Sequence, residues 1–255
     1  MKEKIPREDI LIVDNIHTFI GQFHILEGVS VRVPKGSITV LLGRNGAGKT
    51  TTLKSILGLT PPQEGKVIFE GAEIQGKRAF NVANLGIGYV PEHRAIFRAL
   101  SVLENLKLAE RKKGDFERSA DFIFELFPDL KRLSKLPGNH LSGGQQQMLA
   151  VARALVPENK LLLIDEPSEG LAPILIQQMM EAIRVLSEKT TILLVEQNFI
   201  MASQLAQQFV IIDDGQSVRD GSMTDLVNDT GMIHQYLGAS IKTRKELEME
   251  HEAQA

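Results

Sequence analysis

Alternating apolar and polar residues near the start of the chain predict β-strands. The valines of the segment 29–33 alternate with polar neighbours, and a Pro-Lys-Gly turn follows them. A period of two is typical of a half-buried strand, so short antiparallel strands are expected over residues 10–36. The apolar run at 66–69, followed by a Glu-Gly pair, predicts another strand and a hairpin.

Short uninterrupted apolar runs predict strands that are buried on both faces. At 255 residues, the chain can hold one large α/β domain or a domain with an inserted lobe. Asp214-Gly215 after the last run is a hairpin signal. The apolar runs cover residues 37–42, 87–90, 160–165, 191–195 and 209–213.

Between about residues 93 and 156 the apolar spacing becomes helical. This stretch interrupts the predicted strands and is expected to be an inserted helical subdomain. We expect one domain over residues 1–240 and a charged tail at 241–255 that is a solvated helix or disordered. One helical face is formed by Phe116, Ala120, Ile123, Phe124 and Phe127.

A glycine-rich loop follows the strand predicted at 37–42. Residues 43–50 fit the pattern G-x-x-x-x-G-K-[ST], and apolar residues at helical spacing follow. Backbone N–H groups of such a loop bind phosphate, Lys49 reaches the β- and γ-phosphates, and the Thr50 hydroxyl binds Mg²⁺. The predicted nucleotide triphosphate site consists of Gly43, Arg44, Asn45, Gly46, Ala47, Gly48, Lys49, Thr50 and Thr51.

The strand predicted at 160–165 ends in two carboxylates, Asp165 and Glu166. A buried strand with an acidic end is common in α/β proteins, but beside a phosphate loop it acquires a chemical meaning. Asp165 can hold Mg²⁺ directly or through water. Glu166 can act as the general base toward the attacking water.

A second glycine turn, Leu-Ser-Gly-Gly-Gln at 141–145, opens a predicted helix. Ser142 is a good N-cap, and a helix N-terminus suits an anion. One nucleotide does not need two such helix N-termini from the same subunit. We therefore expect Ser142, Gly143, Gly144 and Gln145 to serve a nucleotide held by another copy.

These three motifs, in this order and spacing, resemble the ATP-binding subunits of ABC transporters over residues 10–240. The resemblance implies a P-loop NTPase core with an N-terminal antiparallel β-subdomain and an inserted helical subdomain. It also implies ATP and Mg²⁺ as cofactors and ATP hydrolysis that is coupled to transport. Two ATPase subunits, either copies of this chain or this chain and a paralogue, would form a head-to-tail dimer.

The same resemblance assigns further residues. Glu92, in Tyr-Val-Pro-Glu, stands where the family usually has a glutamine that senses the γ-phosphate and Mg²⁺. Gln197 stands where a catalytic histidine is usual, and Ala172 replaces the usual aspartate of the D-loop. Adenine would stack near Ile20, with an aromatic contact from a flanking phenylalanine or only an apolar contact from Ile20. The implied catalytic set is Lys49, Glu166 and Gln197, and the implied metal set is Thr50, Asp165 and Glu92.

Three local patterns resemble the second ATPase subunit of branched-chain amino acid importers. They are the segments 89–92, 166–173 and 195–198. Alternatives stay open: an importer of urea or short amides, a lipid exporter, or a soluble ABC ATPase that acts on ribosomes or DNA. The soluble class usually has two cassettes or a long coiled coil, and the exporters more often keep histidine at position 197. A small-molecule kinase would not explain the second glycine turn.

The implied partners are two integral-membrane permease subunits and, indirectly, an extracytoplasmic substrate-binding protein. The chain would lie at the cytoplasmic face of the membrane as a peripheral subunit, because no apolar run is long enough to span a bilayer. Residues 93–98 contain an apolar pair that is flanked by arginines. Such a segment suits a permease-docking groove. The alternative is a solvated loop in which the apolar pair is buried. A net charge of −3 does not indicate nucleic-acid binding, and zero cysteines exclude disulfides and cysteine-bound metals.

Overall fold

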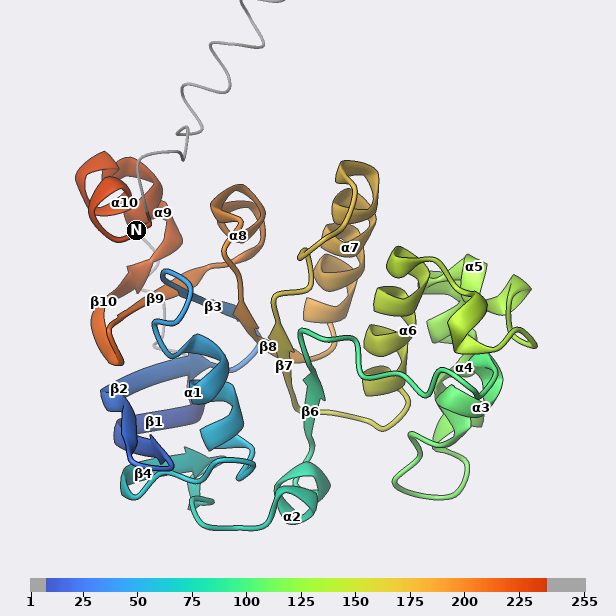
Figure 1. Ribbon diagram of the computed structural model, residues 1–255, viewed down its shortest axis with the longest axis horizontal. Coiled ribbons are helices and arrows are strands. Elements are labelled where there is room, and N and C mark those ends of the chain that lie inside the picture. Colours follow the sequence, from blue (N-terminus) through green and yellow to red (C-terminus); the bar gives the residue numbers. More distant parts are fainter. Residues whose placement is uncertain (1–7, 238–255) are drawn as a thin grey trace, which may run out of the picture. The chain divides into compact units, whose positions relative to one another are not determined.

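The computed structural model describes residues 8–237, in which the chain divides into two units (Figure 1). Unit 1 contains residues 8–79 and 193–237, and unit 2 contains residues 80–192. The chain returns to unit 1 through strand β8 (Thr191–Val195), which is buried along its whole length as its apolar sequence predicts. No helix among the described residues is long and apolar enough to cross a membrane.

Unit 1 begins with an antiparallel sheet of order β2-β1-β4-β5. The predicted antiparallel pairing is confirmed, but β1 and β2 are long strands of 12 residues each. Bulges in their register bend the pair, and at one of them Asn15 has a left-handed φ of 46°. The elements are β1 (Asp9–Ile20), β2 (Phe23–Pro34), β4 (Glu64–Phe69) and β5 (Ala72–Glu73).

The rest of unit 1 builds the support for the phosphate loop. Strand β3 (Ile38–Leu42) is fully buried and pairs in parallel with β9 (Gln208–Asp213). The hairpin predicted at Asp214-Gly215 is confirmed, because both residues have positive φ and β10 (Gln216–Ser222) returns antiparallel to β9. Its helices are α1 (Lys49–Ile56), α8 (Phe199–Leu205), α9 (Met223–Asn228) and α10 (Thr230–Leu237).

Unit 2 contains two parallel strands that pair with each other and a cluster of helices around α6 (Figure 1). Strands β6 (Ile87–Val90) and β7 (Leu161–Asp165) lie where the apolar runs predict them. Helix α2 (Ala79–Asn84) begins at the last residue of unit 1's first segment, and α7 (Pro173–Ser187) follows β7. The helical cluster comprises α3 (Val102–Lys107), α4 (Asp115–Leu126), α5 (Pro128–Arg132), a 3-10 turn (Gly138–His140) and α6 (Gly143–Leu155).

The helical stretch begins later than its sequence pattern indicates, since residues 93–101 form a loop. Arg94 and Ala95 both have left-handed φ angles, of 58° and 45°, which no helix accepts. Fully buried Asn105 fixes the next part of this loop: its carboxamide accepts the Phe97 N–H and donates to the Phe97, Leu100 and Ser101 carbonyls. The division into a 1–240 domain with an inserted subdomain stays a prediction, and the predicted tail lies outside the described residues.

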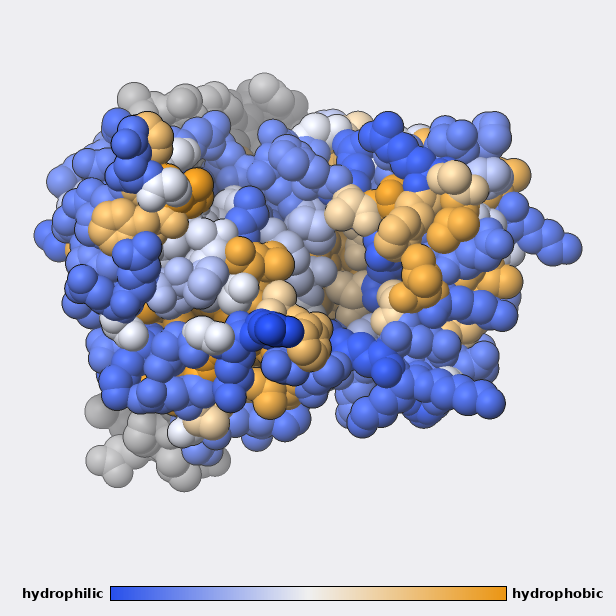
Figure 2. Space-filling view, turned by 60° about the horizontal axis from the view of Figure 1, so that its bottom comes forward, coloured by the Kyte–Doolittle hydropathy of each residue, from blue (hydrophilic) through white to orange (hydrophobic). Residues whose placement is uncertain are grey.

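The apolar surface of unit 2 gathers over the helical elements, where hydrophilic side chains interrupt it (Figure 2). Phe97 is 45% exposed and Leu108 is 56% exposed. The expectation that Phe97 is buried in a solvated loop is therefore wrong. Asn105 holds the Phe97 backbone through both its N–H and its carbonyl.

Candidate functional site

The phosphate loop in unit 1 is closed by contacts that its sequence makes possible. Lys49 is buried, and its ammonium group donates to the Gly43 and Arg44 carbonyls at 2.9 and 3.0 Å. The Ala47 N–H donates to the Arg44 carbonyl at 3.2 Å. The cation of Lys49 therefore lies within the loop, where it can neutralise phosphate charge.

Two glycines of the loop are required by geometry. Gly43 has φ 147°, and a Cβ there would lie 2.1 Å from the Ile212 carbonyl oxygen. Gly48 has φ 108°, and a Cβ there would lie 2.7 Å from Leu26 Cδ2. The loop thus packs directly against β9 and β2, which leaves no room for side chains at these positions.

Gln197, also in unit 1, is exposed after the end of β8. A residue that the sequence did not single out, Glu196, positions it. The Glu196 carboxylate is buried and accepts the N–H groups of Gln197 and Asn198 at 3.0 and 2.9 Å. Asn198 in turn caps α8 by accepting the Met201 N–H. The sequence feature that could have indicated this role of Glu196 is a charged residue directly after a buried strand.

Asp165 and Glu166 lie in unit 2 at the carboxyl end of β7, and both are buried. The Tyr89 hydroxyl donates to Asp165 at 3.2 Å. Burial and the neighbouring Asp165 carboxylate raise the pKa of Tyr89, so the tyrosine keeps its proton for this bond. Glu166 has a left-handed φ of 46°, a strained conformation that is more frequent at functional sites.

The second glycine turn has the cap that its sequence predicts. The Ser142 hydroxyl accepts the Gln145 N–H at 3.3 Å, and the Gln145 side chain accepts the Ser142 N–H at 3.0 Å. Ser142 and Gly143 are exposed, whereas Gly144 is buried. A Cβ on Gly144 would lie 2.3 Å from Leu175 Cδ1, so this glycine lets α6 and α7 pack closely.

Glu92 lies in unit 2 after β6 and is partly exposed. Its carboxylate lies 3.6 Å from Nδ1 of His93. The D-loop, residues 167–172, follows Glu166, and Ala172 acts as the N-cap of α7 without a side-chain bond. An aspartate at this position would supply the oxygen acceptor that N-caps prefer, which the alanine cannot do.

The adenine candidates lie at the tip of the β1–β2 hairpin. Phe19 stacks on the imidazole of His24, with ring centroids 4.1 Å apart. Phe23 is 66% exposed and Ile20 is 49% exposed. The Phe19 ring is therefore occupied on the face that His24 covers, and Phe23 is the more open aromatic surface.

Each unit brings together its own part of the predicted site. Unit 1 holds the loop 43–51 and Gln197, and unit 2 holds Glu92, Asp165, Glu166 and the turn 142–145. Within the described residues there is no group of three His, Cys, Asp or Glu residues that could hold a metal ion. The oxygen donors that are present suit Mg²⁺, which commonly binds one or two carboxylates together with substrate phosphates.

Comparison with known proteins supports this chemistry. The family model described as ABC transporter matches residues 26–169. The chain is 40% identical over 232 residues to the high-affinity branched-chain amino acid transport ATP-binding protein BraG of Pseudomonas aeruginosa. The match covers 90% of this chain and 100% of that protein. It is 31% identical to the lipopolysaccharide export system ATP-binding protein LptB of Haemophilus influenzae, with 91% and 99% covered.

Solved structures agree with the sequence relatives. An ATP-binding cassette of an ABC transporter in its ADP conformation has a TM-score of 0.79 and 27% sequence identity to the chain. The match covers 91% of this chain and 100% of that one. A nucleotide-free cassette matches with the same TM-score at 26% identity. The expected fold, an α/β P-loop ATPase of the ABC type, is confirmed.

Proposed function

The chain belongs to the ABC transporter family, and on that premise we propose that it is the ATP-hydrolysing subunit of an importer of branched-chain amino acids. The observation that carries the substrate is the 40% identity to BraG along that protein's whole length. The relative LptB, whose name assigns it to lipopolysaccharide export, is less similar at 31%. Gln197, at the position where the lipid exporters more often keep histidine, also favours the importer.

The residues of unit 1 bind the triphosphate. The N–H groups of the loop 43–51 face the phosphates, and Lys49 neutralises their charge. Gln197 is neutral across the physiological pH range, so it contributes a hydrogen bond to the γ-phosphate but no titrating proton. The buried Glu196 carboxylate fixes the backbone from which Gln197 extends.

The residues of unit 2 supply the hydrolytic step. Glu166 accepts a proton from the attacking water, which is the role of a general base. Asp165 and Glu92 are the ligands that this unit would offer to Mg²⁺, and Thr50 is the one that unit 1 would offer; the ion would neutralise charge on the triphosphate. Tyr89 donates to Asp165 and so orients that carboxylate.

A second ATPase subunit completes the site. The turn at Ser142 and Gly143 is exposed and is capped by its own side chains, which suits a surface that receives another subunit's nucleotide. Closure of this dimer around ATP, and its reopening after hydrolysis, does work on two membrane permease subunits. Such a coupling requires that ATP contacts the closed state better than the open one. The chain acts at the cytoplasmic face of the membrane.

The test is uptake of labelled leucine and labelled urea by cells that lack this gene. The cells are complemented with the wild type, with Glu166→Gln, or with Glu188→Gln, a matched change at an exposed glutamate. Leucine uptake that only the wild type and Glu188→Gln restore supports the proposal. Turnover of purified Glu166→Gln should fall by about 10²–10⁴, the range for loss of a general base.

Each other outcome changes a different part of the proposal. Urea uptake in place of leucine uptake keeps the ATPase and moves the substrate to short amides. Near-normal ATP turnover by Glu166→Gln removes Glu166 from the role of general base. ATP hydrolysis by the purified wild type without uptake of either compound points to the lipid exporter or to the soluble ATPase.

A further inference from the structure

Two histidines face each other on the antiparallel sheet of unit 1. His17 lies on β1 and His24 on β2, next to the turn of the hairpin that these two strands form. Nδ1 of His17 lies 3.2 Å from Nε2 of His24, and the two ring centroids are 5.2 Å apart. In the metal-free chain this contact is a hydrogen bond, in which one imidazole donates its N–H and the other accepts. Neutral imidazole is also the commonest metal ligand among side chains.

The register of the two strands brings these rings together. His17 is paired with Glu27, and Phe19 is paired with His24. A register shift between Thr18 and Phe19 lies between the two pairs, so that β2 advances by three residues where β1 advances by two. The two histidines are therefore diagonal neighbours, a separation that aromatic side chains can bridge.

The distance between the facing nitrogens matches the separation of two ligands on one zinc ion. A tetrahedral Zn²⁺ with imidazole nitrogens at about 2.0–2.1 Å holds any two of them about 3.3 Å apart. The observed separation is 3.2 Å. The strands can therefore keep their positions when an ion binds. Small rotations about χ2, which is a soft torsion in histidine, turn both lone pairs toward the ion.

The outer nitrogens of the two rings face side chains that suit metal-bound histidine. Nε2 of His17 lies 3.4 Å from the Asn15 carboxamide, and Nδ1 of His24 lies 4.0 Å from a Glu27 carboxylate oxygen. A histidine that binds a metal usually donates its other N–H to an oxygen acceptor, which fixes the tautomer. Glu27 supplies such an oxygen, and Asn15 presents one after a half-turn of its carboxamide. Each imidazole can thus carry its proton on the outer nitrogen and leave the inner one free for an ion.

The surroundings of the pair favour a cation and leave it accessible. Glu27 on β2 and Glu64 on β4 are cross-strand partners of His17, so their side chains stand on the same face of the sheet. Both glutamates are exposed, and their negative charges attract a dication to this face. The His24 side chain is 33% exposed, so an ion can reach it from solution.

We propose that His17 and His24 form a binding site for a divalent transition metal ion of the Zn²⁺ class. The two imidazoles are its protein ligands, and water fills the remaining positions. This composition agrees with the absence of a three-residue metal group within residues 8–237. Imidazole suits Zn²⁺, Cu²⁺ and Ni²⁺, whereas Mg²⁺ and Ca²⁺ prefer oxygen ligands. The site thus differs in its chemistry from the proposed Mg²⁺ ligands, and the inference does not depend on the proposed function.

Metal binding has a consequence for the tip of the β1–β2 hairpin. The ion links β1 to β2 beside the turn, and the His24 ring also stacks on Phe19. Ile20 and Phe23, the residues considered for the adenine contact, lie within the same tip. The ion therefore orders the segment that carries these side chains, and amide hydrogen exchange measures that order.

The experiment is a Zn²⁺ titration of the full-length chain, without an affinity tag or nucleotide, after metal has been removed with a chelator. Calorimetry gives the affinity and stoichiometry for the wild type, His17→Gln, His24→Gln and His234→Gln. His234 is an exposed histidine of α10 and serves as the matched control. Melting temperatures in the absence of Zn²⁺ establish that each variant is folded.

We expect the wild type and His234→Gln to bind one Zn²⁺ per chain. His17→Gln and His24→Gln should each lose affinity by about tenfold or more, since loss of an outer partner alone typically costs about 10- to 100-fold. Electron paramagnetic resonance with one equivalent of Cu²⁺ should show two bound nitrogens in the wild type and one in either variant. Zn²⁺, but not Mg²⁺, should slow hydrogen exchange at residues 17–24 of the wild type.

Three results would overturn the proposal. The first is equal Zn²⁺ affinity of the wild type and His24→Gln. The second is a loss of affinity in His234→Gln as large as that in His24→Gln, which would assign the ion to another part of the chain. The third is a wild type that shows neither heat of binding nor exchange protection with Zn²⁺. ATP hydrolysis by the purified chain in Mg²⁺ tests the proposed function separately.

Discussion

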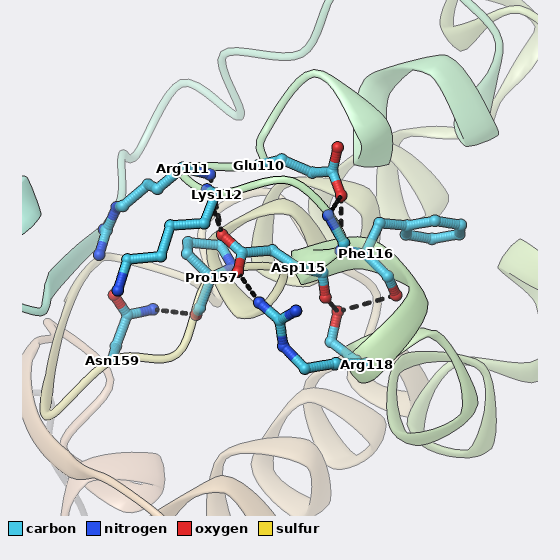
Figure 3. Close-up of polar contacts among 10 residues, drawn as sticks. Glu110, Arg111, Lys112, Asp115, Phe116, Arg118, Pro157 and Asn159 are labelled. Atoms are coloured by element: carbon cyan, nitrogen blue, oxygen red, sulfur yellow. Dashed lines mark hydrogen bonds and ion pairs between the residues drawn. The ribbon is translucent and has the colours of Figure 1, made fainter.

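Replacing Asp115 with alanine tests whether one buried carboxylate organises the loop that carries Arg111. The carboxylate is 7% exposed and accepts the backbone N–H groups of Arg111 and Lys112 at 2.9 and 2.8 Å (Figure 3). Hydrogen bonds to a charged group contribute about 1.5–3 kcal/mol each. The ion pair with Arg118 adds at most about 1 kcal/mol, because Arg118 is solvent-exposed.

Removal of the carboxylate also relieves its desolvation, which offsets part of this loss. We therefore expect Asp115→Ala to lower the free energy of unfolding by about 3 kcal/mol, the lower end of two charge-assisted bonds. For a chain of this size, the melting temperature should fall by roughly 6–12 °C. The assays are urea denaturation and a thermal melt, with Asp121→Ala on the exposed side of α4 as the control.

The pH dependence of the stability difference between the wild type and Asp115→Ala provides a second test of this prediction. Burial alone would raise the pKa of Asp115, but the N–H groups of Lys112 and Arg111 and the Arg118 guanidinium outweigh it and lower the pKa. A lowered folded-state pKa stabilises the fold above the unfolded value, about 3.9, and this contribution is lost as the pH falls through the folded value. The wild type and Asp115→Ala should therefore differ constantly between pH 8 and 5 and converge below about pH 4.

Two results would refute this reasoning. A change of less than about 0.5 kcal/mol, the range of ordinary surface substitutions, would show that the loop holds without the carboxylate. An equal loss in Asp121→Ala would show that a general charge effect, and not this set of bonds, stabilises α4.

Three further predictions concern other parts of the molecule. Lys49→Ala should weaken ATP binding by about 10- to 100-fold in a titration, because it removes a charge-assisted contact. Ser142→Arg should leave nucleotide binding by the single subunit intact but block the ATP-dependent dimer, which gel filtration in the Glu166→Gln background would detect. Asn105→Ala should lower the free energy of unfolding by about 1–3 kcal/mol, since it leaves the Phe97 N–H without its acceptor, while the Phe97, Leu100 and Ser101 carbonyls keep backbone donors. Limited proteolysis should then cut the 97–101 loop first, and an unchanged cleavage pattern would contradict the role of Asn105.

Short-range patterns were enough to predict most strands and the two glycine turns. The strand predictions at 87–90 and 191–195 match the observed bounds, because a short apolar run between polar residues has few other ways to be buried. The cap of α6 was predictable for a similar reason, since Ser142 and Gln145 satisfy each other within one turn. The roles proposed for the phosphate loop and for Asp165 rest on residue type and neighbouring sequence.

Side-chain bonds to nearby loops and strained backbone conformations decided what the sequence left open. Glu196, Asn105 and Asp115 each hold a loop through buried side-chain bonds that follow no period. The left-handed backbone at Arg94, Ala95 and Glu166 depends on tertiary support, because no local preference of these residues favours it.

The chain alone thus determined its family chemistry, a phosphate loop with acidic residues and a second capped turn, because backbone geometry and residue type at adjacent positions specify it. Only the tertiary structure placed Arg94, Arg111 and Arg153, which are up to 59 residues apart in the chain, around one cavity. Convergence of distant residues on one cavity arises from packing of separate elements, and no period along the sequence records it.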